Sequence, residues 1–269
     1  MAEILIENCD CFDFMDRMIM NDIKADLIIT SPPYNTSWKG SSDKYNCRYD
    51  VFNDNFTNEE YGIWTIDLFN QFDKILQKDG VILYNLSYST EQSRIMSFWL
   101  SLFSIINETT FIIADIIAWK KRSAIPNNTS KNKLTRIVEF IFVICRNNEF
   151  MSFNSNKQIK SISSKNQSFY ENIFNFIEAP NNDGVCSLNK STYSSELVEK
   201  LLNIYCPKDT QIVVYDPFMG TGSTAIGCEK YSDNIICLGS ELSKDQVDYS
   251  NERVKKYRHE CNSKEKNII

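Results

Sequence analysis

The stretch VVYDPFMGTGSTA at residues 213–225 joins an apolar run to a turn with two glycines, and a pattern typical of a helix follows. Gly220 and Gly222 let the backbone approach a ligand closely, and the first turn of a helix offers unpaired N–H groups. The stretch lacks the lysine of a phosphate-binding loop and the full spacing of a dinucleotide fingerprint. It therefore predicts a strand, a turn and a helix around a nucleotide-like ligand without phosphates.

Short apolar runs alternate with longer helical patterns along the rest of the chain. We expect strands at 26–30, 80–86, 111–119, 139–145, 211–215 and 234–238, and helices at 58–76, 90–102, 196–205, 222–230 and 244–256. Buried strands separated by helices predict an α/β fold with a doubly wound, mostly parallel sheet.

Two polar segments interrupt this alternation. Residues 35–55 are rich in tyrosine, and residues 146–190 are rich in Asn, Ser and Lys without clear periodicity. Long ordered loops tend to carry binding functions. We expect one domain over residues 1–269, with a small irregular insert at 146–190 and a flexible polar tail at 261–269.

Composition excludes several classes of protein. The nine cysteines are scattered and odd in number, which favours a reduced, cytoplasmic protein over a disulfide scaffold. No apolar stretch approaches the roughly 18–20 residues that span a bilayer, and the N-terminus does not resemble a secretion signal, so we expect no membrane association. His259 is the only histidine, and Cys9 and Cys11 lack partners at zinc-site spacing, so no metal site is expected. The net charge of −6 argues against nonspecific coating of nucleic acid but leaves room for a local basic groove.

Acidic residues follow two of the expected strands. Glu241 ends the second of them, where a carboxylate can accept hydrogen bonds from both hydroxyls of a ribose. Asp216 lies at the carboxyl end of the first strand, where open α/β sheets bind ligands, and could face a cationic group. Singly, either could be a helix cap or a solvated side chain, but their order around the glycine turn favours a binding site.

A second motif, LIITSPPYN at residues 27–35, is an apolar strand that ends at two prolines and a tyrosine. The prolines fix the backbone and remove two N–H donors, so the Ser31 hydroxyl and the Pro32 carbonyl form a rigid corner of acceptors. Accepting the hydrogens of an exocyclic base amine localises its lone pair, and Tyr34 can stack on an extruded base. The alternative is that the prolines simply end a strand and Tyr34 covers the edge of the core.

Together, LIITSPPYN and DPFMGTGST resemble the catalytic and cofactor motifs of the S-adenosylmethionine-dependent DNA amino-methyltransferases, a restriction-modification type of enzyme. The catalytic motif precedes the cofactor motif, and this order is similar to that of the circularly permuted beta group. The resemblance implies a Rossmann-like class I methyltransferase fold and sequence-specific methylation of a flipped base in double-stranded DNA. The catalytic residues that it implies are Ser31, Pro32, Pro33 and Tyr34, and the cofactor-binding residues are Asp10, Thr192, Asp216, Pro217, Phe218, Gly220, Gly222 and Glu241.

Two segments depart from the family pattern. Asp10 follows Asn8-Cys9, where the family usually has Gly-Asp. Before the glycine turn, family members often have a Thr and a Pro ahead of a helix; this chain has Thr192, but Ser194 in place of the Pro.

The serine of the second motif favours cytosine as the target base. Within the family, Thr-Ser-Pro-Pro-Tyr is typical of enzymes that make N4-methylcytosine, and Asp-Pro-Pro-Tyr of those that make N6-methyladenine. Adenine-N6 methylation and a non-catalytic DNA-binding module with a vestigial cofactor pocket are the alternatives. Methylation at carbon 5 is disfavoured because no cysteine directly follows a proline.

A basic stretch offers contacts for DNA phosphates. Residues 119–136 contain no acid and six basic side chains: Lys120, Lys121, Arg122, Lys131, Lys133 and Arg136. The alternative is a solvated loop. Readout of a DNA sequence is expected in residues 146–190 or 38–55, and Trp64 and Trp119 are expected in the core. A cognate restriction endonuclease, and the choice between monomer and weak dimer, are left open.

Overall fold

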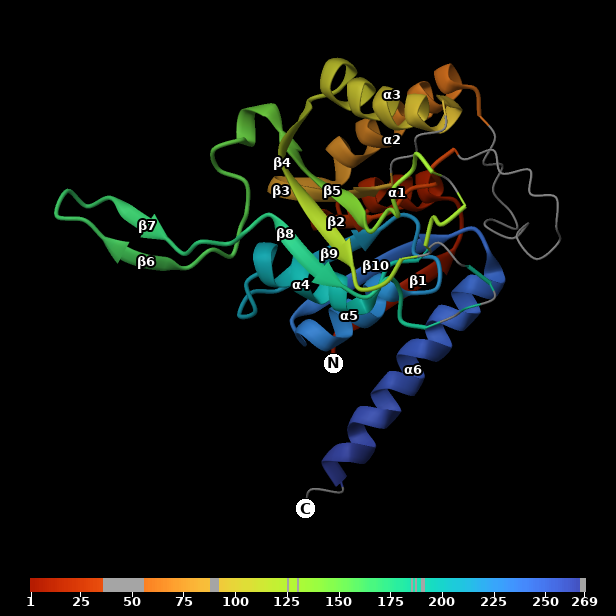
Figure 1. The fold of residues 1–269 in the computed structure, drawn as a ribbon. Helices are drawn as coiled ribbons and strands as arrows, with labels where there is room; N and C mark the ends of the chain where they lie inside the picture. Colours follow the sequence, from red (N-terminus) through yellow and green to blue (C-terminus); the bar gives the residue numbers. More distant parts are fainter. Residues whose placement is uncertain are drawn as a thin grey trace.

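A sheet of eight strands runs through the computed structural model, which describes residues 1–35, 56–87, 92–124, 126–129, 131–184, 186, 188–189 and 192–266 (Figure 1). The strand order is β1-β10-β9-β2-β3-β5-β4-β8. Neighbouring strands are parallel except that β5 is antiparallel to β3 and β4. The strands are β1 (Glu3–Asn8), β2 (Ala25–Thr30), β3 (Leu76–Leu86), β4 (Phe111–Lys121), β5 (Val138–Arg146), β8 (Phe176–Ala179), β9 (Ile212–Asp216) and β10 (Ile235–Glu241). The predicted mostly parallel α/β sheet is confirmed.

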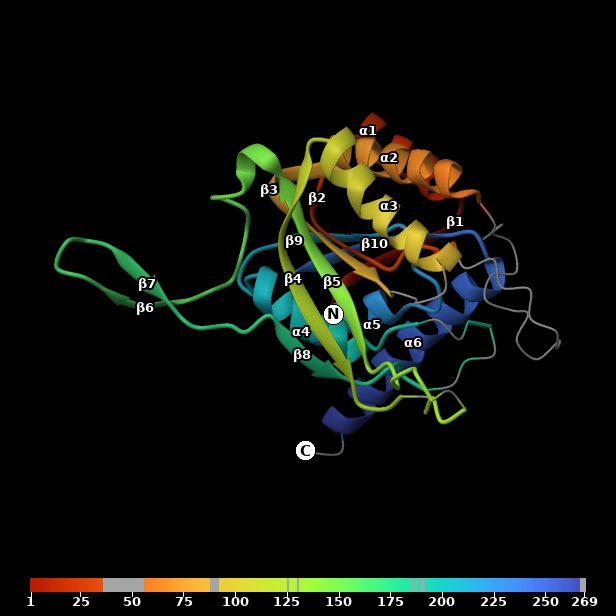
Figure 2. The ribbon, with the colours of Figure 1, turned by 45° about the horizontal axis from the view of Figure 1, so that its top comes forward.

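Helices cover both faces of the sheet (Figure 2). One face carries α1 (Cys11–Met20), α2 (Asn58–Ile75) and α3 (Gln92–Glu108), and the other carries α4 (Ser195–Tyr205), α5 (Ser223–Tyr231) and α6 (Lys244–Lys266). Successive side chains of β2 point to opposite faces of the sheet and so contribute to both hydrophobic cores. Leu27 and Ile29 pack with α4 and α5, whereas Ile28 packs with α1 and α2. Within the described residues, no helix is both long enough and apolar enough to cross a membrane.

Some elements escaped prediction, and two helices run further than expected. β1, α1 and all the elements of the insert, including β8, were not predicted, while α3 continues to Glu108 and α6 to Lys266. Residues 261–266, expected in a flexible tail, are therefore helical, and 267–269 lie outside the described residues. Residues 38–55, a candidate for sequence readout, also lie outside them.

The insert at 146–190 is more regular than its sequence indicates. It contains a short 3-10 helix (Asn147–Glu149), a hairpin of β6 (Ile159–Ile162) and β7 (Ser168–Tyr170), and β8, which pairs with β4 in the main sheet. The chain enters the hairpin beside the early part of β3, where the Asn154 amide donates to the Asp79 carbonyl at 2.8 Å. The hairpin thus projects from the edge at which the parallel strands begin (Figure 1), away from their carboxyl ends.

Candidate active site

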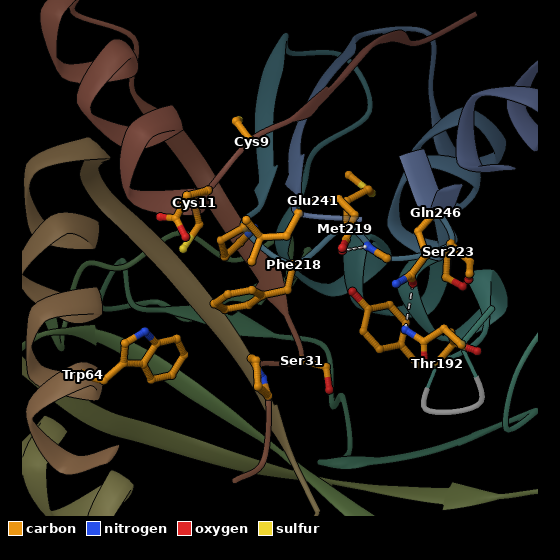
Figure 3. A pocket seen from close by; sticks show the side chains of 18 residues that line it. Cys9, Cys11, Ser31, Trp64, Thr192, Phe218, Met219, Ser223, Glu241 and Gln246 are labelled. Atoms are coloured by element: carbon orange, nitrogen blue, oxygen red, sulfur yellow. Dashed lines mark hydrogen bonds between the residues drawn. The ribbon is translucent and has the colours of Figure 1, made fainter. Parts of the chain in front are cut away.

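A cavity, here called the first cavity, lies at the carboxyl ends of β1, β2, β9 and β10 (Figure 3). These strands end at one edge because they are parallel, so segments far apart in the chain meet there. Its lining contains no lysine or arginine among the described residues, which agrees with a ligand without phosphates. Of the expected residues, the lining includes Asp10, Ser31, Pro33, Thr192, Pro217, Phe218, Gly220 and Glu241.

The Glu241 carboxylate is held in one orientation by the backbone. The amide of Gly220 donates to Oε2 and the amide of Ser243 to Oε1, each at 2.9 Å. A carboxylate oxygen can accept more than one hydrogen bond, so this geometry presents acceptors to a diol in the first cavity. The expected ribose contact therefore fits this position.

An aromatic wall borders the same cavity. The Phe218 and Trp64 rings lie with their centroids 5.8 Å apart and are tilted by 39°, and Trp64 also stacks on Tyr61 at 5.6 Å. Trp64 was expected in the core, but α2 brings it into the cavity lining. Flat apolar surfaces of this kind suit a purine ring.

Polar side chains line the first cavity on the side away from Trp64, where Figure 3 labels Thr192, Ser223 and Gln246. Asn189 donates to the Gln246 side-chain oxygen at 3.0 Å, and both side chains are buried. Sequence reasoning missed Asn189, Ser223 and Gln246. Gln246 reaches the cavity only through the packing of α6, which the local sequence does not reveal. This end suits the polar amino-acid group of a ligand such as S-adenosylmethionine.

Asp216 does not line the cavity, in contrast to our expectation. Its carboxylate is 1 % exposed and accepts hydrogen bonds from the hydroxyls of Thr30, Tyr193 and Thr224 and from the Phe218 amide. Burial raises the pKa of this carboxyl above its usual range, although the four donors oppose that rise. Asp216 therefore ties β2, β9 and α5 together behind the cavity wall, and the role of facing a cationic ligand does not match its position.

Gly222 is also a packing residue and does not line the cavity. Its φ is +82°, and a Cβ there would lie 2.0 Å from Ser250 Oγ. A glycine is thus required where α5 meets α6. Gly220, with a φ of +55°, is the glycine of the turn that lines the cavity.

A second cavity adjoins the first and shares Ser31, Thr192 and Tyr193 with it. Here the Ser31 Oγ lies 2.6 Å from the Tyr34 hydroxyl, which accepts a hydrogen bond from Asn85 at 2.9 Å. Besides the ring that was expected to stack on a base, Tyr34 thus contributes a hydroxyl that hydrogen-bonds with Ser31 and Asn85. The Pro33 carbonyl accepts from Tyr61 at 2.7 Å, and Pro32 is buried and belongs to neither lining.

A row of polar side chains continues from Ser31 along the second cavity. Asn85 Nδ2 lies 3.4 Å from Ser31 Oγ and 3.3 Å from Glu139 Oε2, and Glu139 forms an ion pair with Lys121 at 2.5 Å. Trp119, 1 % exposed and in the core as expected, also borders this cavity. Sequence reasoning did not single out Asn85 or Glu139.

Three of the expected phosphate-binding residues form ion pairs with acidic side chains. Lys120 pairs with Glu178 at 2.6 Å, and Arg122 makes two hydrogen bonds to Glu196 at 3.0 and 2.6 Å. With Lys121 paired to Glu139, these three are not the unpaired basic patch that the stretch predicts. Lys131, Lys133 and Arg136 are exposed on the β4–β5 loop, and Arg136 borders the second cavity.

The comparisons with known proteins agree on one class of enzyme. A family model described as DNA methylase, of the N6/N4 methyltransferases, matches residues 25–252. The chain is 25% identical to the orphan methyltransferase M.BamHII of Bacillus amyloliquefaciens, in a match that covers 88% of this chain and 91% of that protein.

Solved structures share the fold. The cytosine-N4-specific PvuII DNA methyltransferase has a TM-score of 0.65 at 16% identity, with 93% of this chain and 86% of that chain covered. The complex of M1.HpyAVI with S-adenosylmethionine (SAM) has a TM-score of 0.58 at 19% identity, with 93% and 98% covered.

Proposed function

The chain belongs to the DNA methylase family of N6 and N4 methyltransferases, and from this premise we propose that it methylates the exocyclic N4 amine of cytosine in DNA. It is an S-adenosylmethionine-dependent DNA methyltransferase; the choice of base is the proposal. The observation that carries this choice is the neutral hydroxyl of Ser31 at the junction of the two cavities. The cytosine-N4 specificity of the PvuII enzyme, which has the same fold, supports it.

The first cavity is proposed to hold the cofactor. Glu241 would accept hydrogen bonds from the ribose hydroxyls, Phe218 and Trp64 would flank the adenine, and Asn189 and Gln246 would contact the amino-acid end. Asp10 lies in the same lining, where its carboxylate caps α1 by accepting from the Phe12 amide at 2.8 Å. When bound, S-adenosylmethionine supplies a methyl group carried on a positively charged sulfur.

The corner at Ser31 is proposed to orient the target amine. Asn85 donates to the Tyr34 hydroxyl, which can in turn donate to Ser31 Oγ and so fix its direction. The two N–H groups of Asn85 can both be used in its shorter contacts, with Tyr34 and Glu139, which leaves one lone pair of Ser31 Oγ for an amine hydrogen. The adjoining prolines offer no competing N–H. The amine lone pair is thereby directed out of the base plane, away from its ring conjugation.

DNA is proposed to approach along the β4–β5 loop. Lys131, Lys133 and Arg136 are exposed there and can neutralise phosphates near a flipped base, and Arg136 borders the second cavity. Sequence readout is proposed for Asn181 and Asn182 of the insert, since both line the second cavity.

The test combines a product assay with variants of the corner. Purified protein, labelled S-adenosylmethionine and unmethylated genomic DNA should yield labelled N4-methylcytosine on nucleoside mass spectrometry. Labelled N6-methyladenine would overturn the proposed base. Ser31→Ala should lower kcat/KM by about 10- to 100-fold, as expected for losing a group that acts in the transition state. The matched control Ser87→Ala removes a hydroxyl from the same cavity lining and should retain wild-type activity.

A further inference from the structure

The polar row along the second cavity follows from strand alternation. On the sheet face that packs under α4 to α6, each of three strands presents two core residues and then one polar residue as it reaches the cavity. These series are Val81, Leu83 and Asn85 on β3, Ile117, Trp119 and Lys121 on β4, and Val143, Ile141 and Glu139 on the antiparallel β5. The three polar residues therefore occupy one face at one edge, beside Ser31.

Lys121 is held in place from two sides. Its ammonium lies 2.5 Å from Glu139 Oε1 and 5.1 Å from the centre of the Trp119 ring. The Lys121 and Glu139 side chains are 23 and 14 % exposed, so this pair is better shielded from water than a surface ion pair. An ammonium has three N–H groups, of which the contact with Glu139 engages one. Lys121 is thus a positioned donor in the wall of the second cavity.

Cytosine and adenine differ at the place where such a donor acts. Both bases carry an exocyclic amine beside a ring nitrogen that accepts hydrogen bonds. The next ring position is a carbonyl, C2=O, in cytosine and a C–H in adenine. The polar row runs from Ser31 through Asn85 and Glu139 to Lys121. When the amine lies at Ser31, a donor further along this row lies toward position C2 of the base.

We propose that Lys121 donates a hydrogen bond to the O2 carbonyl of the flipped cytosine and so selects cytosine over adenine. The inference rests on the proposed function and adds to it a residue that reads the base. Glu139 is a positioning residue, because it fixes Lys121 through the ion pair. This role replaces the phosphate contact that the sequence predicted for Lys121.

The experiment removes each partner of the proposed hydrogen bond. The substrate is DNA with the methylated site found in the product assay, carrying at the target position either cytosine or a 2-aminopyridine C-nucleoside. That analogue keeps the amine and the adjacent ring nitrogen but has C–H in place of the carbonyl. The enzymes are the wild type, Lys121→Met, and the control Lys120→Met, which loses the same charge on the other face of β4, where Lys120 pairs with Glu178.

The measured quantity is the ratio of kcat/KM on cytosine to kcat/KM on the analogue. A hydrogen bond from a charged donor predicts a ratio of about 10 to 100 for the wild type and for Lys120→Met, and a ratio near one for Lys121→Met. A merely structural role of Lys121 lowers both rates and leaves the ratio unchanged.

Two results overturn the inference while cytosine methylation stands. One is a wild-type ratio near one, which remains decisive if Lys121→Met does not fold, and the other is a wild-type ratio retained by Lys121→Met. If the wild type instead labels adenine, the proposed function fails and the inference fails with it.

Discussion

Alanine at the two glycines of the cofactor turn should impair different properties, stability at Gly222 and cofactor binding at Gly220, because Gly222 packs against a helix and Gly220 lines the first cavity. In Gly222→Ala, the new Cβ meets Ser250 Oγ at 2.0 Å and Ser250 Cβ at 2.9 Å, with φ at +82°. The left-handed backbone costs about 1–2 kcal/mol and the overpacking about 1–3 kcal/mol. The free energy of unfolding should therefore fall by about 2–5 kcal/mol, a large share of the roughly 5–15 kcal/mol typical of a domain.

Gly220→Ala is the matched comparison. Its Cβ meets nothing closer than 3.5 Å, from Asn189 Nδ2 and Gln246 Oε1, so only the backbone cost of about 1–2 kcal/mol remains. The same methyl group projects toward the polar end of the first cavity. The dissociation constant of S-adenosylmethionine should therefore rise about tenfold or more, the equivalent of roughly 1.4 kcal/mol.

Chemical denaturation and titration calorimetry measure the two effects separately. Ser250→Gly should recover about 1–3 kcal/mol of the Gly222→Ala loss in a double-mutant cycle, because it removes both of the closest atoms. The assignment is wrong if Gly222→Ala leaves the free energy of unfolding unchanged and weakens the cofactor instead. A Gly220→Ala protein less stable than Gly222→Ala would also contradict it.

Three further predictions follow from the cavity linings and the position of the hairpin. Glu241→Gln should raise the dissociation constant of S-adenosylmethionine about 10- to 100-fold through weaker hydrogen bonds to the ribose, measured by calorimetry, and an unchanged constant would contradict that contact. Burial raises the pKa of the Cys9 thiol above its usual range, so Cys9 should react with iodoacetamide at neutral pH more slowly than free cysteine does, and more slowly still with cofactor bound, because Cys9 lines the first cavity. Peptide mass spectrometry measures the rate, and labelling as fast as that of free cysteine would refute the shift. Replacing residues 157–172 by a short Gly-Ser turn should leave kcat/KM and the methylated sequence unchanged, since the hairpin projects from the opposite edge of the sheet, and a changed sequence preference on methylome sequencing would place readout there.

Apolar runs made the centre of the sheet predictable, and weak patterns hid its edges. β2 and β9 are short and almost wholly buried, so hydrophobicity alone identifies them. β1 is an edge strand with Glu3 exposed and Leu5 48 % exposed, and β8 has four residues with Phe176 53 % exposed. Such strands depend on the neighbour with which they pair, and that neighbour is not visible in the local sequence.

The roles of charged residues were harder to predict than their positions. Lys120, Lys121 and Arg122 form one basic cluster in the sequence, yet their acidic partners lie 58, 18 and 74 positions away. Asp216 was correctly placed at the end of a strand, but whether its carboxylate faces the ligand or the interior depends on donors from three other segments. Only tertiary packing decides which charges remain available to a ligand.

The direction of β5 explains why the second cavity has both an acceptor and a donor beyond Ser31. Parallel strands deliver the residues at their carboxyl ends to the active edge, as β2 does with Ser31 and β3 with Asn85. Because β5 is antiparallel, it delivers Glu139 from its beginning instead, opposite Trp119 on β4 and diagonal to Lys121. An ion pair can therefore form across two adjacent strands at the cavity itself. A parallel β5 would place Glu139 at the opposite edge, and Lys121 would lose the partner that holds it against the proposed base.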